Sequence, residues 1–343
     1  MINPLDKSHL FESIIALPQQ CRHVYQTIQN LIIPPKYHQV NQIIISGMGG
    51  SALGGRIIES VYGLSLKLPL IILTDYDLPA WANEKTLVLA SSFSGNTEET
   101  VSTAKQALER HCPLMIIAAG GELIDLAIQS QSPYYQIDPV YNPSKQPRMA
   151  IGYSVIGQLM ILAKLNMINF DVKEIDFLVQ TMEKIIANNN AESFAEKMFN
   201  KQVILVSARH LTGAVHTIKN QMNENAKNLS QRQDLPELNH HLMEGLRFPK
   251  SNPENVIFFF LDSSLYPARM RQRLKITQAV VAKNHIQSLL WTATAKQPLA
   301  EAFEAIQFGA LVVYYLANLY KIDPAAIPWV DYFKKELGKQ PAG

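Results

Sequence analysis

The sequence has few of the features that mark secreted, membrane or nucleic-acid-binding proteins. It contains only two cysteines, Cys21 and Cys112, which are too few for a disulfide framework and indicate a reducing compartment. Its 31 basic and 29 acidic residues nearly cancel, so no charge excess points to nucleic acid or to a membrane surface. The most apolar runs, 256–261 and 309–317, are shorter than the roughly 18 residues of a membrane span.

A leader segment is not expected either, because residues 1–7 lack a basic stretch followed by an apolar one. We therefore expect a cytoplasmic protein that binds neither nucleic acid nor membrane. The 343 residues are long for one domain, and 47% of them are hydrophobic, which is enough for a sizeable core in each of two domains.

Short apolar runs alternate with helical patterns along both halves of the chain. Such alternation predicts an α/β fold whose sheets are mostly parallel and flanked by helices. In the first half, strands are predicted at 42–46, 69–74, 86–90 and 113–118; after a helical stretch over 152–200, the second half has strands at 202–207, 255–261 and 287–291. We expect an N-terminal domain over 1–152, a helical connector over 153–190 and a C-terminal domain over 191–343.

Two loops rich in glycine and hydroxyl side chains follow the first and third predicted strands. They contain Gly49, Gly50 and Ser51 in one loop, and Ser92, Ser94 and Thr97 in the other. Each loop leads into a predicted helix, whose first-turn N–H groups and positive dipole end favour an anion such as phosphate. The alternative for the second loop is an ordinary helix cap, with Thr97 as the capping residue. The second half has no counterpart of the segment 94–97.

The first loop also matches the dinucleotide fingerprint G-x-G-x-x-A, starting at Gly47. In that interpretation Asp75, at the end of the second predicted strand, would bind a ribose hydroxyl, although it lies further along than the usual spacing of about 20 residues. A dinucleotide leaves the second hydroxyl-rich loop without a role. Two such loops on neighbouring strand ends suit one phosphomonoester better.

Three further stretches carry groups that suit acid–base chemistry. Arg148 follows a proline-marked loop and could bind phosphate or a developing oxyanion; a surface arginine is the alternative. Glu224 ends a predicted helix among several asparagines, whose amides could orient its carboxylate; a solvated helix end is the alternative. His240 and His241 could be metal ligands, but no third ligand is near in the sequence, which favours a metal-free acid–base histidine.

Taken in order, these stretches resemble the bifunctional phosphoglucose/phosphomannose isomerase family, which is built from two sugar isomerase (SIS) domains. The resemblance runs from the first strand to the last helix and rests on five motifs: Gly47–Ser51, Ser92–Glu99, Pro147–Arg148, Glu224–Lys227 and Pro236–His240.

The resemblance implies two SIS-type domains and a hexose 6-phosphate substrate, isomerised through a cis-enediolate without metal or other cofactor. It assigns the phosphate to Gly49, Gly50, Ser51, Ser92, Ser94 and Thr97. Glu224 would be the base, Arg148 would stabilise the enediolate, and His240 of a second subunit would assist ring opening, which implies a homodimer. A lysine near the C-terminus aligns with Lys334, next to Lys335. The family's C-terminal threonine has no match in 324–328, so glucose 6-phosphate is the firmer aldose substrate.

Other functions fit the same domains. A non-catalytic sugar-phosphate sensor would share the phosphate loops but give no role to Glu224, His240 or Lys334, and no DNA-binding output segment is visible. The isomerase half of an amino-sugar synthase would need an amidotransferase domain, which does not precede the first strand.

Overall fold

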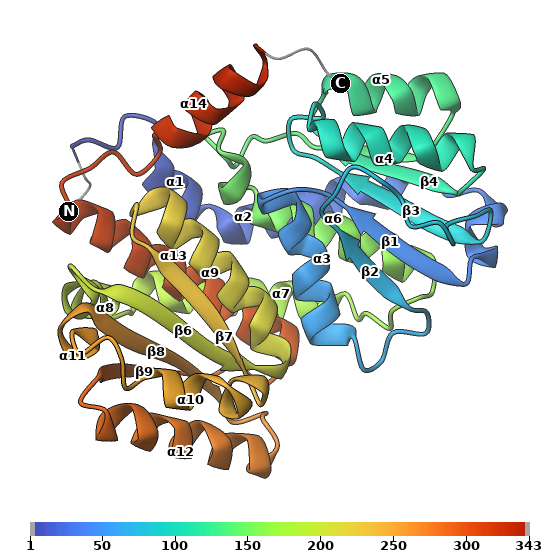
Figure 1. Ribbon diagram of the computed structural model, residues 1–343. Helices are drawn as coiled ribbons and strands as arrows, with labels where there is room; N and C mark the ends of the chain where they lie inside the picture. Colours follow the sequence, from blue (N-terminus) through green and yellow to red (C-terminus); the bar gives the residue numbers. More distant parts are fainter. Residues whose placement is uncertain (1–3, 340–343) are drawn as a thin grey trace.

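A computed structural model of the chain describes residues 4–339. The ends of the two predicted domains, 1–3 and 340–343, lie outside the described residues. Two sheets lie side by side with helices around and between them, as Figure 1 shows. Every strand pair is parallel, so the predicted α/β class is confirmed.

The first sheet has five strands in the order β2-β1-β3-β4-β5. Its strands are β1 Gln42–Ser46, β2 Leu70–Leu73, β3 Thr86–Ser91, β4 Leu114–Ala118 and β5 Tyr134–Gln136. The helices of this half are α1 Leu10–Ile15, α2 Leu17–Thr27, α3 Gly50–Tyr62, α4 Glu98–Glu109, α5 Gly121–Ser130 and α6 Ile151–Lys164. The first four strands were predicted because both faces of a parallel sheet are covered and such strands are apolar throughout.

The second sheet has four strands in the order β7-β6-β8-β9. They are β6 Gln202–Ala208, β7 Ser230–Leu235, β8 Val256–Ser263 and β9 Gln287–Ala293. The remaining helices are α7 Lys173–Ala187, α8 Ala191–Met198, α9 Thr212–Asn225, α10 Leu242–Gly245, α11 Asn252–Asn255, α12 Ala268–Lys283, α13 Pro298–Leu319 and α14 Pro328–Leu337. β7 was missed because it is a polar edge strand, whose middle residues are not buried.

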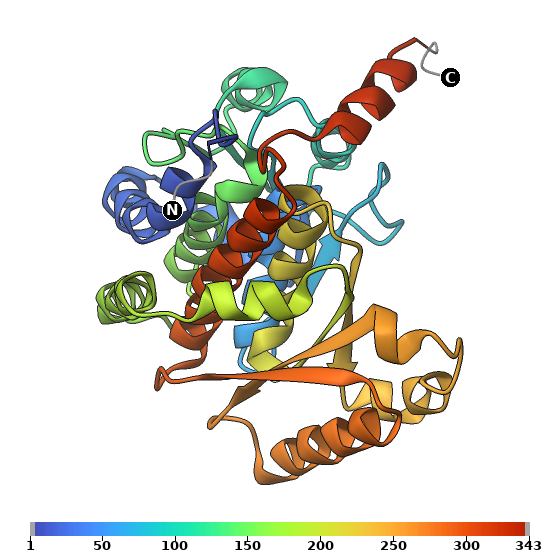
Figure 2. The same cartoon turned by 90° about the vertical axis from the view of Figure 1, so that its left-hand side faces the viewer.

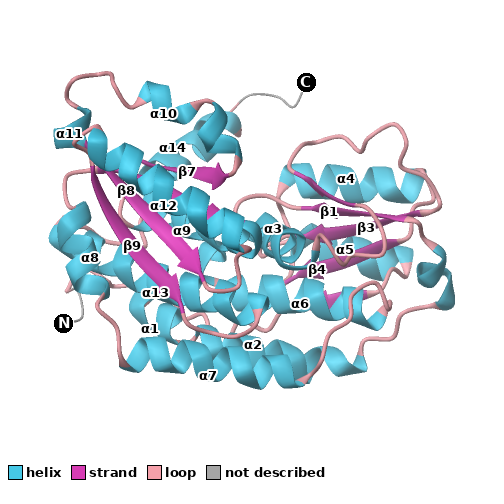
Figure 3. Cartoon of the chain, turned by 90° about the horizontal axis from the view of Figure 1, so that it is seen from below, coloured by secondary structure: helices cyan, strands magenta, loops and turns pink. Residues whose placement is uncertain are grey.

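The main hydrophobic core lies between the two sheets and belongs to both halves. The view from below in Figure 3 shows helices filling this space. Apolar side chains of β1 and β8 belong to the same buried cluster, together with residues of α3, α6, α9 and α13. A second, smaller cluster lies on the other face of the first sheet, under α4 and α5. The two sheets are therefore joined through shared helices and not through a linker alone.

The long helix α13 is apolar enough, by length and composition alone, to cross a membrane, although its contiguous apolar runs are short. Within residues 4–339 it is the one helix of this kind, and 94% of its most apolar window is buried inside the protein. It packs against α7, α8 and α9, which is the position of a core helix.

Candidate active site

The two hydroxyl-rich loops leave the same edge of the first sheet side by side. Ser46 at the end of β1 pairs with Ala90 of β3, so both strands end at the same level. A side chain on Gly47 would lie 2.7 Å from the backbone oxygen of Ser91, which shows how closely the loops approach. The backbone N–H of Phe93 donates to Ser51 Oγ at 3.0 Å and ties one loop to the other.

The loop between β3 and α4 is shaped by internal hydrogen bonds and one glycine. Ser92 and Thr97 share a hydroxyl–hydroxyl hydrogen bond of 2.7 Å, and the Gly95 N–H donates to Ser92 Oγ at 3.1 Å. Gly95 has φ +75°, and a Cβ there would meet the backbone oxygen of Gly120 at 1.7 Å, so only glycine fits. Ser94 is exposed, and its Oγ accepts a hydrogen bond from the Asn96 N–H at 3.2 Å.

The capping interpretation of Thr97 is wrong. Thr97 occupies the N-cap position of α4, but its hydroxyl bonds to Ser92 and, among the described residues, no side chain caps this helix. The N-cap position of α3 is Gly49, which has no side chain to offer. Two adjacent helix N-termini therefore lie next to each other with first-turn N–H groups free of side-chain caps, an arrangement that suits an anion. Gly49, Gly50, Ser51, Ser92, Ser94 and Thr97 are the residues that the sequence predicts to bind phosphate, and we call them the phosphate cradle.

Two polar residues of α6 form hydrogen bonds with residues of the two loops, and neither was predicted from the sequence. Gln158 Nε2 donates to the Ser51 carbonyl at 3.1 Å and lies 3.0 Å from Ser91 Oγ. Ser154 Oγ donates to the same carbonyl at 3.2 Å. Both side chains are buried, and they interrupt an otherwise apolar helix, which is the signal that could have revealed them.

Arg148 connects the cradle to the second half of the molecule. It lies in the 3₁₀ turn Pro147–Met149, which packs so closely on the start of α3 that a Cβ on Gly50 would lie 2.8 Å from the Pro147 carbonyl oxygen. The Arg148 side chain is only 2% exposed, and its Nη1 is 3.6 Å from Glu224 Oε2. Glu224 is 32% exposed at the C-terminal end of α9. Residues 76 positions apart are thus joined beside the cradle.

The remaining donors of Arg148 are also used. Nε donates to Asn225 Oδ1, Nη1 to Gln146 Oε1 at 2.8 Å, and Nη2 to the carbonyls of Ala325 at 2.7 Å and Pro324 at 3.3 Å. The asparagines near Glu224 were expected to orient its carboxylate, and this is wrong. Asn225 holds the arginine, and Asn223 binds Ser230. The carboxylate is held by the charge of Arg148 instead.

Burial and several nearby cations shift the pKa of Glu224 in opposite directions. Burial raises the pKa of Glu224 above its ordinary value, and the positive charge of Arg148 opposes this most strongly, followed by Lys219, Lys227 and Lys334. Burial lowers the pKa of Arg148, and the negative charge of Glu224 opposes this shift more strongly than any other charge. A carboxyl group whose pKa is raised is a stronger base when ionised, which suits proton abstraction near neutral pH.

Lys227 and Lys334 reach the same space from two different segments. Burial, helped by the charge of Arg148, lowers the pKa of Lys227 to about 8, and its Nζ donates to the Asp323 carbonyl at 2.6 Å. Lys334 lies on α14, and its charge acts on Glu224. Figure 2 shows α14 standing away from the body of the molecule. In the described part of this helix no residue is buried, and Lys334 and Lys335 are both exposed.

His240 lies far from Glu224 within one chain. It ends the 3₁₀ turn Glu237–His240, which follows β7, whereas Glu224 lies near the start of that strand, where Asn223 binds Ser230. The six residues of β7 separate these two ends by roughly 17 Å at about 3.3 Å per residue. His240 and His241 are exposed, and the neighbouring Asn239 is held by Thr277 of α12. Among residues 4–339, no three metal-ligating side chains gather in one place.

The chain is similar in sequence to a family of known proteins. Residues 187–337 match the family described as bacterial phospho-glucose isomerase C-terminal SIS domain. A bifunctional phosphoglucose/phosphomannose isomerase from Caldicellulosiruptor bescii is 31% identical over 96% of this chain and 99% of its own. The enzyme of that name from Thermoplasma volcanium is 30% identical over 88% of this chain and 93% of its own.

Among solved structures, the C-terminal domain of a glucosamine-fructose-6-phosphate aminotransferase from Francisella tularensis superposes with a TM-score of 0.72. The superposition covers 93% of this chain and 98% of that one at 13% sequence identity. At this identity the likeness is one of fold, and it extends over both sheets.

Proposed function

The chain belongs to the bifunctional phosphoglucose/phosphomannose isomerase family, and we propose that it interconverts glucose 6-phosphate, and also mannose 6-phosphate, with fructose 6-phosphate. The observation that carries the proposal is the continuous path from the phosphate cradle through Arg148 to Glu224. A hexose phosphate has its phosphate at one end and its carbonyl at the other. The path offers a site for each end.

Glu224 is proposed as the base of the isomerisation. Its ionised carboxylate would take the C2 hydrogen of the open-chain aldose as a proton, and the electron pair of that bond would form an enediolate. A proton then returns to C1, and the proton of the C2 hydroxyl passes to the C1 oxygen. C2 becomes the carbonyl and C1 carries a hydroxyl, so the ketose forms with no atom gained or lost. The partial exposure of Glu224 and its raised pKa support this role.

Arg148 is proposed to hold the Glu224 carboxylate and to stabilise the enediolate oxygens. Its Nε and Nη2 are held by Asn225 and by backbone carbonyls. Nη1 donates to Gln146 and lies beside Glu224, so the substrate would meet the guanidinium at Nη1. A guanidinium fixed in this way needs no reorganisation when negative charge develops on the substrate.

His240 is proposed to assist ring opening in the site of a second copy of the chain. Within one chain the length of β7 separates it from Glu224, so it can meet that carboxylate only across an interface. This argument supports a homodimer in which each copy supplies one histidine. Lys334 is proposed to reach the substrate from α14, and its effect on Glu224 supports this role.

The division of the chain at 152 and 190 remains a prediction, and the family match over 187–337 supports its C-terminal part. We propose a cytoplasmic enzyme of glycolysis and gluconeogenesis that needs no metal or redox cofactor. Glucose 6-phosphate is expected to be the better aldose, because the segment at 324–325 uses its backbone carbonyls to hold Arg148 and offers no threonine.

A coupled assay tests this proposal. Purified protein is given fructose 6-phosphate, and the appearance of glucose 6-phosphate and mannose 6-phosphate is followed separately, with and without EDTA. We expect both products, glucose 6-phosphate faster, and equal rates with chelator. The absence of both products would favour a non-catalytic sugar-phosphate sensor, and loss of activity with EDTA would contradict the metal-independent mechanism.

A further inference from the structure

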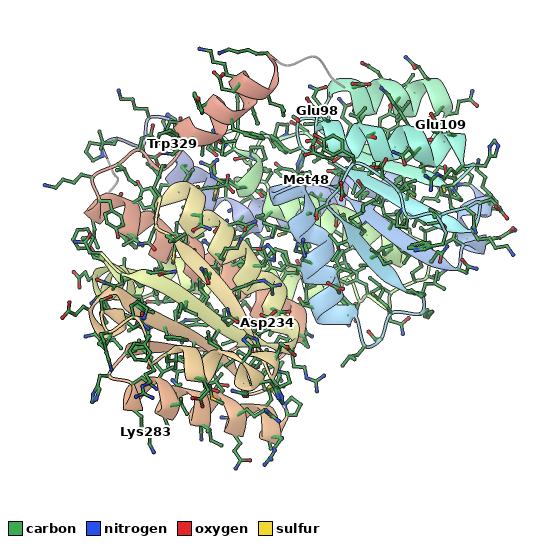
Figure 4. All side chains as sticks on the ribbon, in the orientation of Figure 1. Met48, Glu98, Glu109, Asp234, Lys283 and Trp329 are labelled. Carbon is green, nitrogen blue, oxygen red and sulfur yellow. The ribbon has the colours of Figure 1, made fainter. Side chains whose placement is uncertain are left out.

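A second cleft lies between the two halves, away from Glu224. It has a volume of about 140 Å³ and is bounded by α3 on one side and by α9 and β7 on the other. Figure 4 labels Asp234 at this cleft and Met48 beside the other end of α3. Its polar lining comes from Arg56, Glu59, Thr212, His216, Arg232 and Asp234.

The cleft is separate from the catalytic path. On α9, His216 lies eight residues before Glu224, which is about 12 Å at 1.5 Å per residue. On α3, Arg56 lies six residues beyond Gly50, which is about 9 Å on the same scale. Between them the two helices touch at Gly213, where a Cβ would lie 2.6 Å from the backbone of Arg56 and Ile57.

Two arginines and two carboxylates line the cleft, and Lys219 beside it adds one further positive charge. Arg232 Nη1 binds Asp234 Oδ2 at 2.6 Å, and among the described residues the second oxygen of Asp234 has no hydrogen-bond partner. Within residues 4–339, the side chains of Arg56, His216 and Lys219 make no hydrogen bond and no ion pair. The charge of Glu59 acts on Arg56 only from the same helix. The N-terminal end of α9, at Thr212, adds the positive end of a helix dipole.

Burial and these charges together keep His216 neutral. Burial, together with Arg56, Arg232 and Lys219, lowers the pKa of His216 to about 3. The groups that face it are Arg56 and Glu59 on α3, Lys219 on its own helix, and Arg232 and Asp234 on β7. An anion placed among them would oppose the neighbouring positive charges and favour the protonated form of His216.

We propose that this cleft is a second, non-catalytic binding site for a phosphate-class oxyanion. With His216 protonated, Arg56, Lys219, Arg232 and His216 face the two carboxylates of Glu59 and Asp234. The two positive charges left over match a phosphate monoester, whose charge is about −1.5 to −2 at neutral pH. The anion is either free phosphate or the phosphate of a sugar phosphate.

The test follows the ring proton of His216 by NMR in the full-length protein at neutral pH. Inorganic phosphate and sorbitol 6-phosphate, which cannot isomerise, are titrated in separate experiments. We expect protonation of His216 on addition of either probe, and the tighter probe identifies the source of the anion. The variant Ser94→Ala weakens the catalytic cradle and should leave this response intact, so a failure of the proposed isomerase site is distinguished from a failure of this one.

Variants of the cleft should remove the response. Arg56→Gln and, independently, Arg232→Gln each remove one charged group of the cleft lining and should weaken the binding that protonates His216 about tenfold. Arg269→Gln, an exposed arginine on α12, is the matched control and should have no effect. An unchanged His216 at saturating concentrations of both probes would overturn the proposal. So would protonation that depends on protein concentration and not on phosphate, because carboxylates of a second copy would then neutralise the cleft.

Discussion

The two halves repeat one arrangement of strands but differ where the central loops meet. β1 and β3 correspond to β6 and β8, each pair lying at the centre of its sheet, and α6 and α13 pack against the equivalent helices α3 and α9. In the first half, the neutral Gln158 of α6 lies 3.0 Å from Ser91 Oγ at the end of β3. In the second half, Ser263 at the end of β8 donates to Glu301 of α13.

The difference explains why only the first half is suited to a phosphate. Glu301 is fully buried, and its Oε2 also lies 2.7 Å from His210 Nε2, so a carboxylate of the chain already holds the donors of these loops. A phosphate would bring a second negative charge to the same place. The first half has a neutral amide there and keeps its helix N-termini open. The second half instead uses the other end of α9, where Glu224 lies.

Removing the Glu224 carboxylate should give the largest effect on activity. We expect Glu224→Gln to lower kcat by roughly 10²–10⁴, the usual cost of losing a general base. Binding of sorbitol 6-phosphate should persist, because the cradle belongs to the other half. Steady-state kinetics and calorimetry check this, with the exposed Glu244→Gln as control. Loss of binding together with kcat would contradict the division of labour.

Removing the buried carboxylate of Glu301 should lower the stability of the protein more than removing the neutral amide of Gln158 at the equivalent place in the first half. Glu301→Ala leaves His210 and Ser263 buried without their partner and should cost about 3 kcal/mol of unfolding free energy. Gln158→Ala removes neutral hydrogen bonds and should cost about 1 kcal/mol. Urea unfolding of both variants measures the difference. Equal losses of unfolding free energy would contradict the expectation that the charge of Glu301 makes its removal more costly than that of Gln158.

Sequence reasoning reached the repeated strands and loops because these signals are local. The apolar runs at β1, β3, β6 and β8 and the glycine-rich turns needed no knowledge of distant contacts. β7 was missed because its residues are polar, and Glu301 was missed because α13 reads as a uniformly apolar helix. Two acidic residues three positions apart, Glu301 and Glu304, were the available signal in that helix.

The contacts of Arg148 could not be predicted from the sequence. They join residues 146, 225 and 324–325, which only the packing of α3, α9 and the segment before α14 brings together. Local patterns likewise gave no distance between His240 and Glu224. The family resemblance supplied the idea of a second subunit, and the length of β7 supplies a physical reason for it.

Matched serines in the two halves should differ in their effect on substrate binding. Ser94 and Ser264 are both exposed. Ser94 follows β3 and Ser264 follows β8, and each of these is the third strand of its sheet along the chain. Ser94→Ala should raise KM about tenfold, the cost of one hydrogen bond to a charged group, with little change in kcat. Ser264→Ala should leave KM unchanged. Steady-state kinetics with fructose 6-phosphate would contradict the comparison if both variants bound substrate equally well.

The smallest effect that we expect is the shift in the pH profile caused by Lys334, which is proposed to reach the substrate and whose charge also acts on Glu224. The base must be ionised, so activity is lost as the pH falls through the raised pKa of Glu224. Lys334→Ala removes a charge that opposes this rise, so the acid limb of the kcat profile should move to higher pH. Lys339→Ala, whose Nζ pairs with Glu336 at 2.7 Å, is the control and should not move it. A shift to lower pH would contradict the assigned sign.

Hydrogen exchange at the substrate tests the central claim that the second half moves the proton while the first half holds the phosphate. Glucose 6-phosphate is incubated with enzyme in D₂O, and the C2 hydrogen is followed by NMR. The wild-type protein should replace it with deuterium, whereas Glu224→Gln should bind the sugar phosphate and retain the hydrogen. Exchange at the wild-type rate in Glu224→Gln would contradict the account.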